Sequence, residues 1–183
     1  RLVHPEFALA AFGVLDSIVR VLLSPLRNLI LTIQTLMHAR ADVRVLLNFG
    51  AQIGVLLSVM MLLFYIPSVR NWVLFDIMGL PADIAAPVAT ALQVSFILTL
   101  CMTGACIARG FLIASHNTLA IAFSSAARVI AVVGTGVLGI ALGVNNGAML
   151  GLVALIAAFA TEAVILTSYL VRLERQNRGL FHA

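Results

Sequence analysis

The chain contains five long apolar stretches, each long enough to cross a lipid bilayer as a helix. A membrane-spanning helix needs about 20 mainly apolar residues, because each residue advances about 1.5 Å along the helix axis. The sequence predicts these helices at about residues 6–38, 45–66, 84–108, 119–142 and 147–171. Short polar joints separate them and leave little sequence for any other element. We therefore expect an all-α, polytopic membrane helix bundle in which residues 1–183 form one transmembrane domain.

The composition supports a membrane protein. Hydrophobic residues make up 62% of the chain and charged residues only 10%, and the mean hydropathy is +1.13. In a soluble domain about half of the residues are apolar and about a quarter are charged. We therefore expect membrane lipid to surround the bundle, and we expect no nucleic-acid partner.

The arginines predict an orientation, because basic residues are enriched in the cytoplasmic loops of membrane proteins. If the tail at residues 172–183 is cytoplasmic, six arginines of the joints and the tail lie on the cytoplasmic side and two lie on the other. The six are Arg40, Arg44, Arg109, Arg172, Arg175 and Arg178, and the two are Arg1 and Arg70. This assignment treats residues 109–118 as a polar joint. It predicts a multi-pass protein of the cell's inner (plasma) membrane with a cytoplasmic C-terminus.

The first apolar stretch also carries a row of polar and ionisable side chains. Winding it at 100° per residue places six of them in one arc of roughly 80°, interrupted only by Leu31. They are Asp16, Arg20, Ser24, Arg27, Gln34 and His38. Because a charge in contact with lipid is costly, the row must face protein or a water-filled cavity. The pattern is typical of a helix that lines a pathway.

We therefore expect a substrate cavity lined by Asp16, Arg20, Arg27 and Gln34, with Gln93 from the third stretch as a further donor. Two alternatives stay open. Asp16 and Arg20 lie one helical turn apart and could neutralise each other. Gln93 could equally make an ordinary interhelical hydrogen bond.

Two more ionisable residues, Arg128 and Glu162, lie inside the fourth and fifth stretches. They stand roughly 15 Å and 14 Å from the cytoplasmic ends of their helices, so they share one depth. Since a charge near the bilayer centre costs about 2.5 kcal/mol or more, we expect the two to form a buried ion pair. The pair is either structural or a relay for a proton or substrate. With Asp16, Arg20 and Arg27, the charges sum to +1, which favours an anionic substrate.

The sequence predicts no enzyme. His38 and Asp42 have the H-x-x-x-D spacing of some acyltransferases, but they lie in a charged turn with no other catalytic group nearby. The chain lacks an H-E-x-x-H motif, a phosphate-binding glycine loop and a C-x-x-C motif. Cys101 and Cys106 are interpreted as small buried side chains. We expect no catalytic residue, metal site or cofactor.

Three short stretches are similar to a known transporter family. They are residues 74–83 (LFDIMGLPAD), 108–114 (ARGFLIA) and 142–151 (LGVNNGAMLG). In their order and spacing the chain resembles the C-terminal lobe of the multidrug/oligosaccharidyl-lipid/polysaccharide flippase superfamily, which includes the multidrug and toxin extrusion (MATE) transporters. Within it, Ser124, Ser125 and Arg128, followed by residues 147–151 and Glu162, resemble part of the progressive ankylosis protein branch.

The resemblance implies half of a two-lobed transporter that works by alternating access, with this chain supplying the last five helices. An N-terminal lobe of the same protein is then an expected partner, and a chain that begins at Arg1 looks like part of a longer one. The resemblance to the progressive ankylosis protein branch further implies export of small organic anions. Sodium-coupled extrusion transporters tend to carry an acidic residue in the helix that corresponds to residues 84–108, and none is present here. A coupling ion, proton or sodium, would therefore act through Glu162 or Asp16.

The function expected from these observations is transport of a small organic anion or an amphipathic compound across the membrane. One alternative is a flippase for a lipid-linked saccharide. Another is a structural membrane subunit that transports nothing. The ionisable row on the first stretch disfavours this last reading, since a scaffold has little reason to keep charges in lipid.

Overall fold

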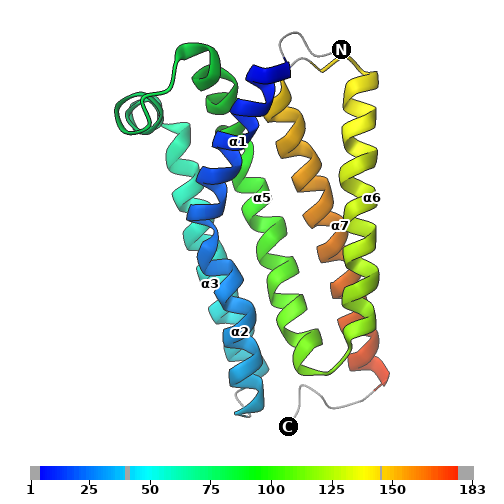
Figure 1. Cartoon of the computed structure of the whole chain (residues 1–183). Helices are drawn as coiled ribbons and strands as arrows, with labels where there is room; N and C mark the ends of the chain where they lie inside the picture. The colour runs from blue at the N-terminus through cyan, green and yellow to red at the C-terminus, as the bar shows by residue number, and fades with distance from the viewer. Residues whose placement is uncertain (1–4, 40–41, 145, 177–183) are drawn as a thin grey trace.

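The computed structural model describes residues 5–39, 42–144 and 146–176, and its long elements are all helices (Figure 1). α1 (Pro5–Leu22) and α2 (Ser24–His38) descend in the view of Figure 1, and α3 (Val43–Leu62) returns beside them. Short helical turns follow at the upper end: η1 (Leu63–Tyr65), α4 (Pro67–Asn71) and η2 (Trp72–Ile77). α5 (Ala82–Ala114), α6 (Thr118–Ala141) and α7 (Gly147–Gln176) then run down, up and down.

Among the residues that the structure describes, four helical segments are long and apolar enough to cross a membrane, and the bent pair α1 and α2 makes a fifth if it counts as one span. The four are Val43–Tyr65, Ala82–Ala114, Thr118–Ala141 and Gly147–Leu173. The prediction of an all-α membrane bundle with about five spanning helices is therefore confirmed. The protein is membrane-embedded.

The single helix predicted over residues 6–38 is instead two helices. α1 ends at Leu22, α2 begins at Ser24, and the chain bends by 41° between them. Pro25 lies in the first turn of α2, where its ring excludes the usual helical hydrogen bond to the carbonyl of Val21. That carbonyl accepts a hydrogen bond from the Ser24 hydroxyl at 2.9 Å instead. The proline is thus the physical cause of the bend.

Two further boundaries differ from the prediction. α5 continues to Ala114, so Arg109 lies inside a helix and not in a polar joint. The helix ends just before His116, whose φ of 57° is in the left-handed region that a helix cannot continue through. α7 likewise continues to Gln176, into the predicted tail. Other residues used to predict the orientation, Arg1, Arg40 and Arg178, lie outside the described residues.

α5 and α7 form the centre of the bundle, and α1, α2 and α3 all pack on α5. α6 packs chiefly on α7, so most of its surface is exposed (Figure 1). Small residues allow the closest approaches. A methyl group added at Gly110 of α5 would lie 2.9 Å from Cβ of Ile33 on α2, and one added at Gly147 would meet Ala8 of α1 at 2.6 Å. The first contact holds α2 against α5, and the second holds α1 against α7, beside the candidate site.

Candidate functional site

The candidate site follows one face of α7. Gly147, Gly151, Leu155 and Phe159 recur every four residues and so lie on the same side of the helix. α1 and α2 flank this face on one side and α6 flanks it on the other. Two partly open cavities meet at Leu155, one of about 340 Å³ and one of about 110 Å³. We call this face, with its two cavities, the α7 groove.

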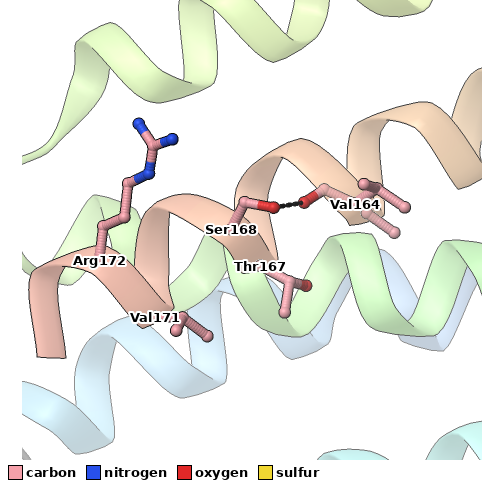
Figure 2. Close-up of a pocket in the computed structure, with 6 residues that line it drawn as sticks. Val164, Thr167, Ser168, Val171 and Arg172 are labelled. Atoms are coloured by element: carbon pink, nitrogen blue, oxygen red, sulfur yellow. Dashed lines mark hydrogen bonds between the residues drawn. The ribbon is translucent and has the colours of Figure 1, made fainter. Parts of the chain in front are cut away.

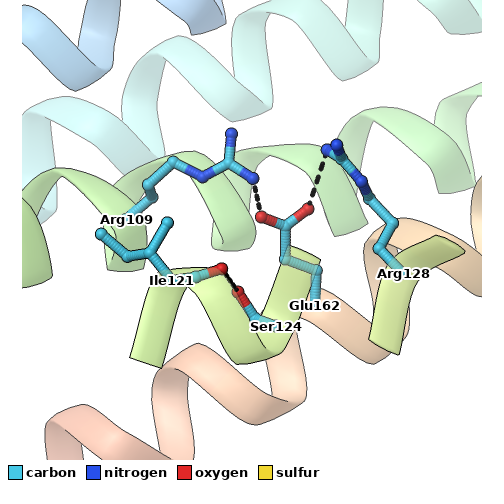
Figure 3. Close-up of polar contacts among 5 residues, drawn as sticks. All are labelled: Arg109, Ile121, Ser124, Arg128 and Glu162. Carbon is cyan, nitrogen blue, oxygen red and sulfur yellow. Dashed lines mark hydrogen bonds and ion pairs between the residues drawn. The ribbon is translucent and has the colours of Figure 1, made fainter. Parts of the chain in front are cut away.

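Glu162 lies on the same face, one turn beyond Phe159, and it is fully buried. Its two carboxylate oxygens are held by arginines from two other helices (Figure 3). Nη2 of Arg109 on α5 pairs with Oε1, and Nη1 of Arg128 on α6 lies 3.3 Å from Oε2. The side chains of Arg109 and Arg128 remain 23% and 34% exposed. The cluster therefore carries a net charge of +1 and presents its arginines to the surface.

The structure brings together Arg128 and Glu162, which the sequence analysis paired, and adds Arg109, which it placed in a loop. The sequence feature that indicates a longer helix lies directly after Arg109. The residues that follow Arg109, Gly110 to Ala114, are almost all apolar and offer no helix-breaking proline, so the helix continues through the charge. A charge inside a spanning helix requires a partner, and Glu162 supplies it.

An aromatic ring connects this cluster to the smaller cavity. Cζ of Arg128 lies 5.7 Å from the centroid of the Phe159 ring, within the range of a cation–π contact. Phe159 also lines the smaller cavity, together with Asp16, Arg20 and Arg27 of the first two helices. The charged groups of α1, α2, α5, α6 and α7 therefore gather along one stretch of the α7 groove.

Asp16, Arg20 and Arg27, three of the predicted cavity residues, do line a common cavity. Arg20 Nε lies 2.6 Å from Asp16 Oδ2, so these two neutralise each other within α1. Arg27 is exposed and, among the described residues, has no carboxylate partner. The smaller cavity therefore presents one ion pair and one uncompensated guanidinium.

The other two predicted residues, Gln34 and Gln93, line neither cavity of the groove. Gln34 is on the same side of α2 as Arg27 but about 10 Å further along it, beyond the end of the cavity. Gln93 is about 140° to 180° around α5 from Leu98 and Met102, which line the cavity. Both glutamines are half-buried in other parts of the bundle.

A shallow hollow of about 600 Å³ lies near the C-terminal end of α7 (Figure 2). It is lined by Ala163, Val164, Thr167, Ser168, Val171 and Arg172. The Ser168 hydroxyl donates a 2.7 Å hydrogen bond to the Val164 carbonyl within the same helix. Arg172 is the sole charge among the lining residues that the structure describes, and it extends away from Thr167 and Val171 in Figure 2. The hollow therefore offers fewer charged groups for ligand recognition than the α7 groove.

No family model, curated protein or solved structure matches this chain. The class of this protein is therefore inferred from its fold and from its candidate site. The chain is a membrane-embedded, all-helical bundle in which a buried glutamate is shared by two arginines on neighbouring helices. In the part of the chain that the structure describes, no three His, Cys, Asp or Glu side chains could hold a metal ion together.

Proposed function

We propose that the protein is a membrane transporter that moves an organic anion along the α7 groove. The observation that carries the proposal is the position of Arg27. This guanidinium is exposed, lines a cavity and has no carboxylate partner among the described residues. It lies about 11 residues, roughly 16 Å, from the end of α2, which is about half the thickness of a bilayer's hydrocarbon core.

A lone guanidinium at that depth is expensive in contact with lipid. Such residues face a bundle interior or a water-filled cavity and mark the paths of substrates and ions. Arg128 stands at a similar depth, about ten residues or roughly 15 Å from the start of α6, and is also partly exposed. Water in the groove would solvate both arginines, whereas lipid would solvate neither.

The net positive charge along the α7 groove favours an anionic substrate. Four arginines and two carboxylates lie along the groove, and their charges sum to +2: Asp16, Arg20, Arg27, Arg109, Arg128 and Glu162. A cleft lined by one sign of charge, with low-dielectric walls, concentrates ligands of the opposite sign. Arginine is also well suited to carboxylates and phosphates, because its planar fork can donate two parallel hydrogen bonds.

We further propose that a second lobe faces the groove and that the two lobes alternate access to it, as the resemblance to the MATE-like superfamily implies. Asp16 is a better candidate than Glu162 for a coupling proton or sodium ion. Glu162 is buried between two arginines, whereas Asp16 is partly exposed and has one partner that is itself 62% exposed.

We propose an inner-membrane location with the C-terminus in the cytoplasm. Among the described residues, Arg44 and Arg172 lie near one end of the bundle and Arg70 lies near the other, which supports this orientation (Figure 1). An impermeant thiol reagent added to intact cells should label Arg70→Cys and leave Ser115→Cys unlabelled. Labelling of Ser115→Cys from outside would reverse the orientation.

The transport proposal is tested in proteoliposomes that contain the full-length protein. Arg27→Gln should lower the rate of anion uptake about tenfold, since a hydrogen bond to a charged group contributes about 1.5–3 kcal/mol. Its melting temperature should stay unchanged, because no described carboxylate loses a partner. Arg44→Gln, an exposed arginine outside the groove, is the matched control and should transport normally. Normal transport by Arg27→Gln, combined with a lowered melting temperature, would instead mean that Arg27 has a structural role and does not line the transport path.

A further inference from the structure

We infer that the larger, apolar cavity of the α7 groove holds the tail of the transported anion. The substrate is then an amphipathic anion with one apolar chain, its head at the arginines and its tail between α1, α6 and α7. This inference rests on the proposed function and narrows its substrate class.

The chemistry of the cavity wall favours an apolar occupant. Every described residue that lines the cavity is Gly, Ala, Val, Leu or Phe, including Phe12 of α1, Val132 and Gly136 of α6, and Gly151 and Leu155 of α7. Its volume of about 340 Å³ is more than twice that of a cavity of about 150 Å³ that binds benzene. The cavity can therefore accept an alkyl chain of several carbons or a pair of rings.

The apolar cavity is continuous with the arginines. On α6, Gly136, Val132 and Arg128 follow one another at four-residue intervals, so they form one column from the cavity to the cation. On α7, Leu155 lines both cavities, and Phe159, one turn further on, contacts the Arg128 guanidinium. Each interval is about 6 Å along the helix axis.

The side chains of α1 follow the same order along the groove, from apolar to charged. Ala8 and Phe12 line the apolar cavity, and Asp16 and Arg20 line the charged one, again at four-residue intervals. Three neighbouring helices thus change from apolar to charged at the same level of the groove. A ligand that spans both cavities must have an apolar end and an anionic end, and a small inorganic anion would use only one of them.

Two glycines of α6 provide a matched pair of variants. A Cβ atom added at Gly136 would have no neighbour within 4 Å, and Gly136 lines the apolar cavity, so the ring of Gly136→Phe should occupy cavity space. A Cβ atom added at Gly134 would also have no neighbour within 4 Å, but Gly134 does not line the cavity. Gly134→Phe on the same helix is therefore the control. Val132→Phe is a second way to fill the cavity.

The test measures binding of methyl phosphate and octyl phosphate by calorimetry, with the full-length protein in nanodiscs of phosphatidylcholine. Empty nanodiscs provide the correction for partition into the bilayer. Octyl phosphate should bind at least tenfold more tightly than methyl phosphate. Gly136→Phe and Val132→Phe should remove this advantage and leave methyl phosphate binding unchanged, while Gly134→Phe should preserve both. Arg27→Gln should weaken binding of both ligands.

The outcomes separate the two proposals. If Arg27→Gln weakens binding but octyl phosphate has no advantage, or keeps it in both filled-cavity variants, the tail site is wrong and anion transport stands. If binding of neither phosphate depends on Arg27, the proposed function fails. If adding phosphatidylglycerol to the nanodiscs abolishes octyl phosphate binding, the cavity belongs to a membrane lipid and the inference is overturned.

Discussion

Glu162→Gln should destabilise the protein more than replacement of either arginine that holds it. Glu162 is fully buried and is the shared partner of Arg109 and Arg128. With glutamine in its place, two guanidinium groups face each other with no negative charge between them. Removal of one partner from a buried ion pair typically costs about 3–5 kcal/mol.

The expected cost for Glu162→Gln is about 3 kcal/mol, at the lower end of that range, because both arginines reach solvent in part. For a protein of this size about 1 kcal/mol corresponds to about 2–4 °C, so the melting temperature should fall by about 6–12 °C. Arg128→Gln leaves the carboxylate paired with Arg109 and should cost only about 1–2 kcal/mol.

The assay is thermal unfolding of the purified protein in one detergent, followed by circular dichroism for the wild type, both single variants and the double variant. If the account is right, Arg128→Gln added to Glu162→Gln should restore part of the lost stability, since it relieves the repulsion between the two guanidinium groups. The reasoning is refuted if Glu162→Gln melts at the wild-type temperature, or if the double variant loses the full sum of the single losses.

Two other predictions concern packing and the ion pair of α1. Gly110→Ala places a methyl group 2.9 Å from Cβ of Ile33 and should destabilise by about 1–3 kcal/mol, whereas Gly134→Ala meets open space and should be neutral or stabilising by up to about 1 kcal/mol; melting temperatures decide both. Asp16→Asn should leave the melting temperature almost unchanged, because Arg20 is 62% exposed and solvent screens its ion pair with Asp16, and a clear fall in the same assay would mean that the pair is buried by another part of the protein.

Much of the fold is predictable from the sequence, because hydropathy reports membrane-spanning segments directly. The bend between α1 and α2 could also have been predicted from the sequence. Pro25 lies in the middle of the predicted helix, and a proline there removes one hydrogen bond and displaces another. The end of α5 was harder to predict, since the polar joint expected over residues 109–118 rested on the charge of Arg109, on the polar residues 115–117 and on the lack of a long apolar run. The charge of Arg109 is tolerated in the helix because Glu162, 53 residues later, lies against it.

Part of the site was predictable from helical periodicity in the first apolar stretch. Asp16 and Arg20 lie one turn apart on α1, and Arg27 lines the same cavity from α2 despite the 41° bend between the two helices. Gln93 was chosen by residue type, and its position on the far side of α5 depends on how α5 packs. Phe159 carried no sequence signal, since an apolar residue in an apolar helix looks like any other until Arg128 is placed above it.

The central claim is that the arginines of the α7 groove face water, and accessibility at position 27 tests it most directly. In a background with Cys101→Ala and Cys106→Ala, Arg27→Cys and Ile130→Cys are reconstituted in vesicles and treated with an anionic, membrane-impermeant thiol reagent. Ile130 is 73% exposed on α6 and carries no polar group, so it should be covered by lipid. The account predicts reaction at position 27 and none at position 130. An unreactive position 27, or equal rates at both positions, would contradict a water-filled groove.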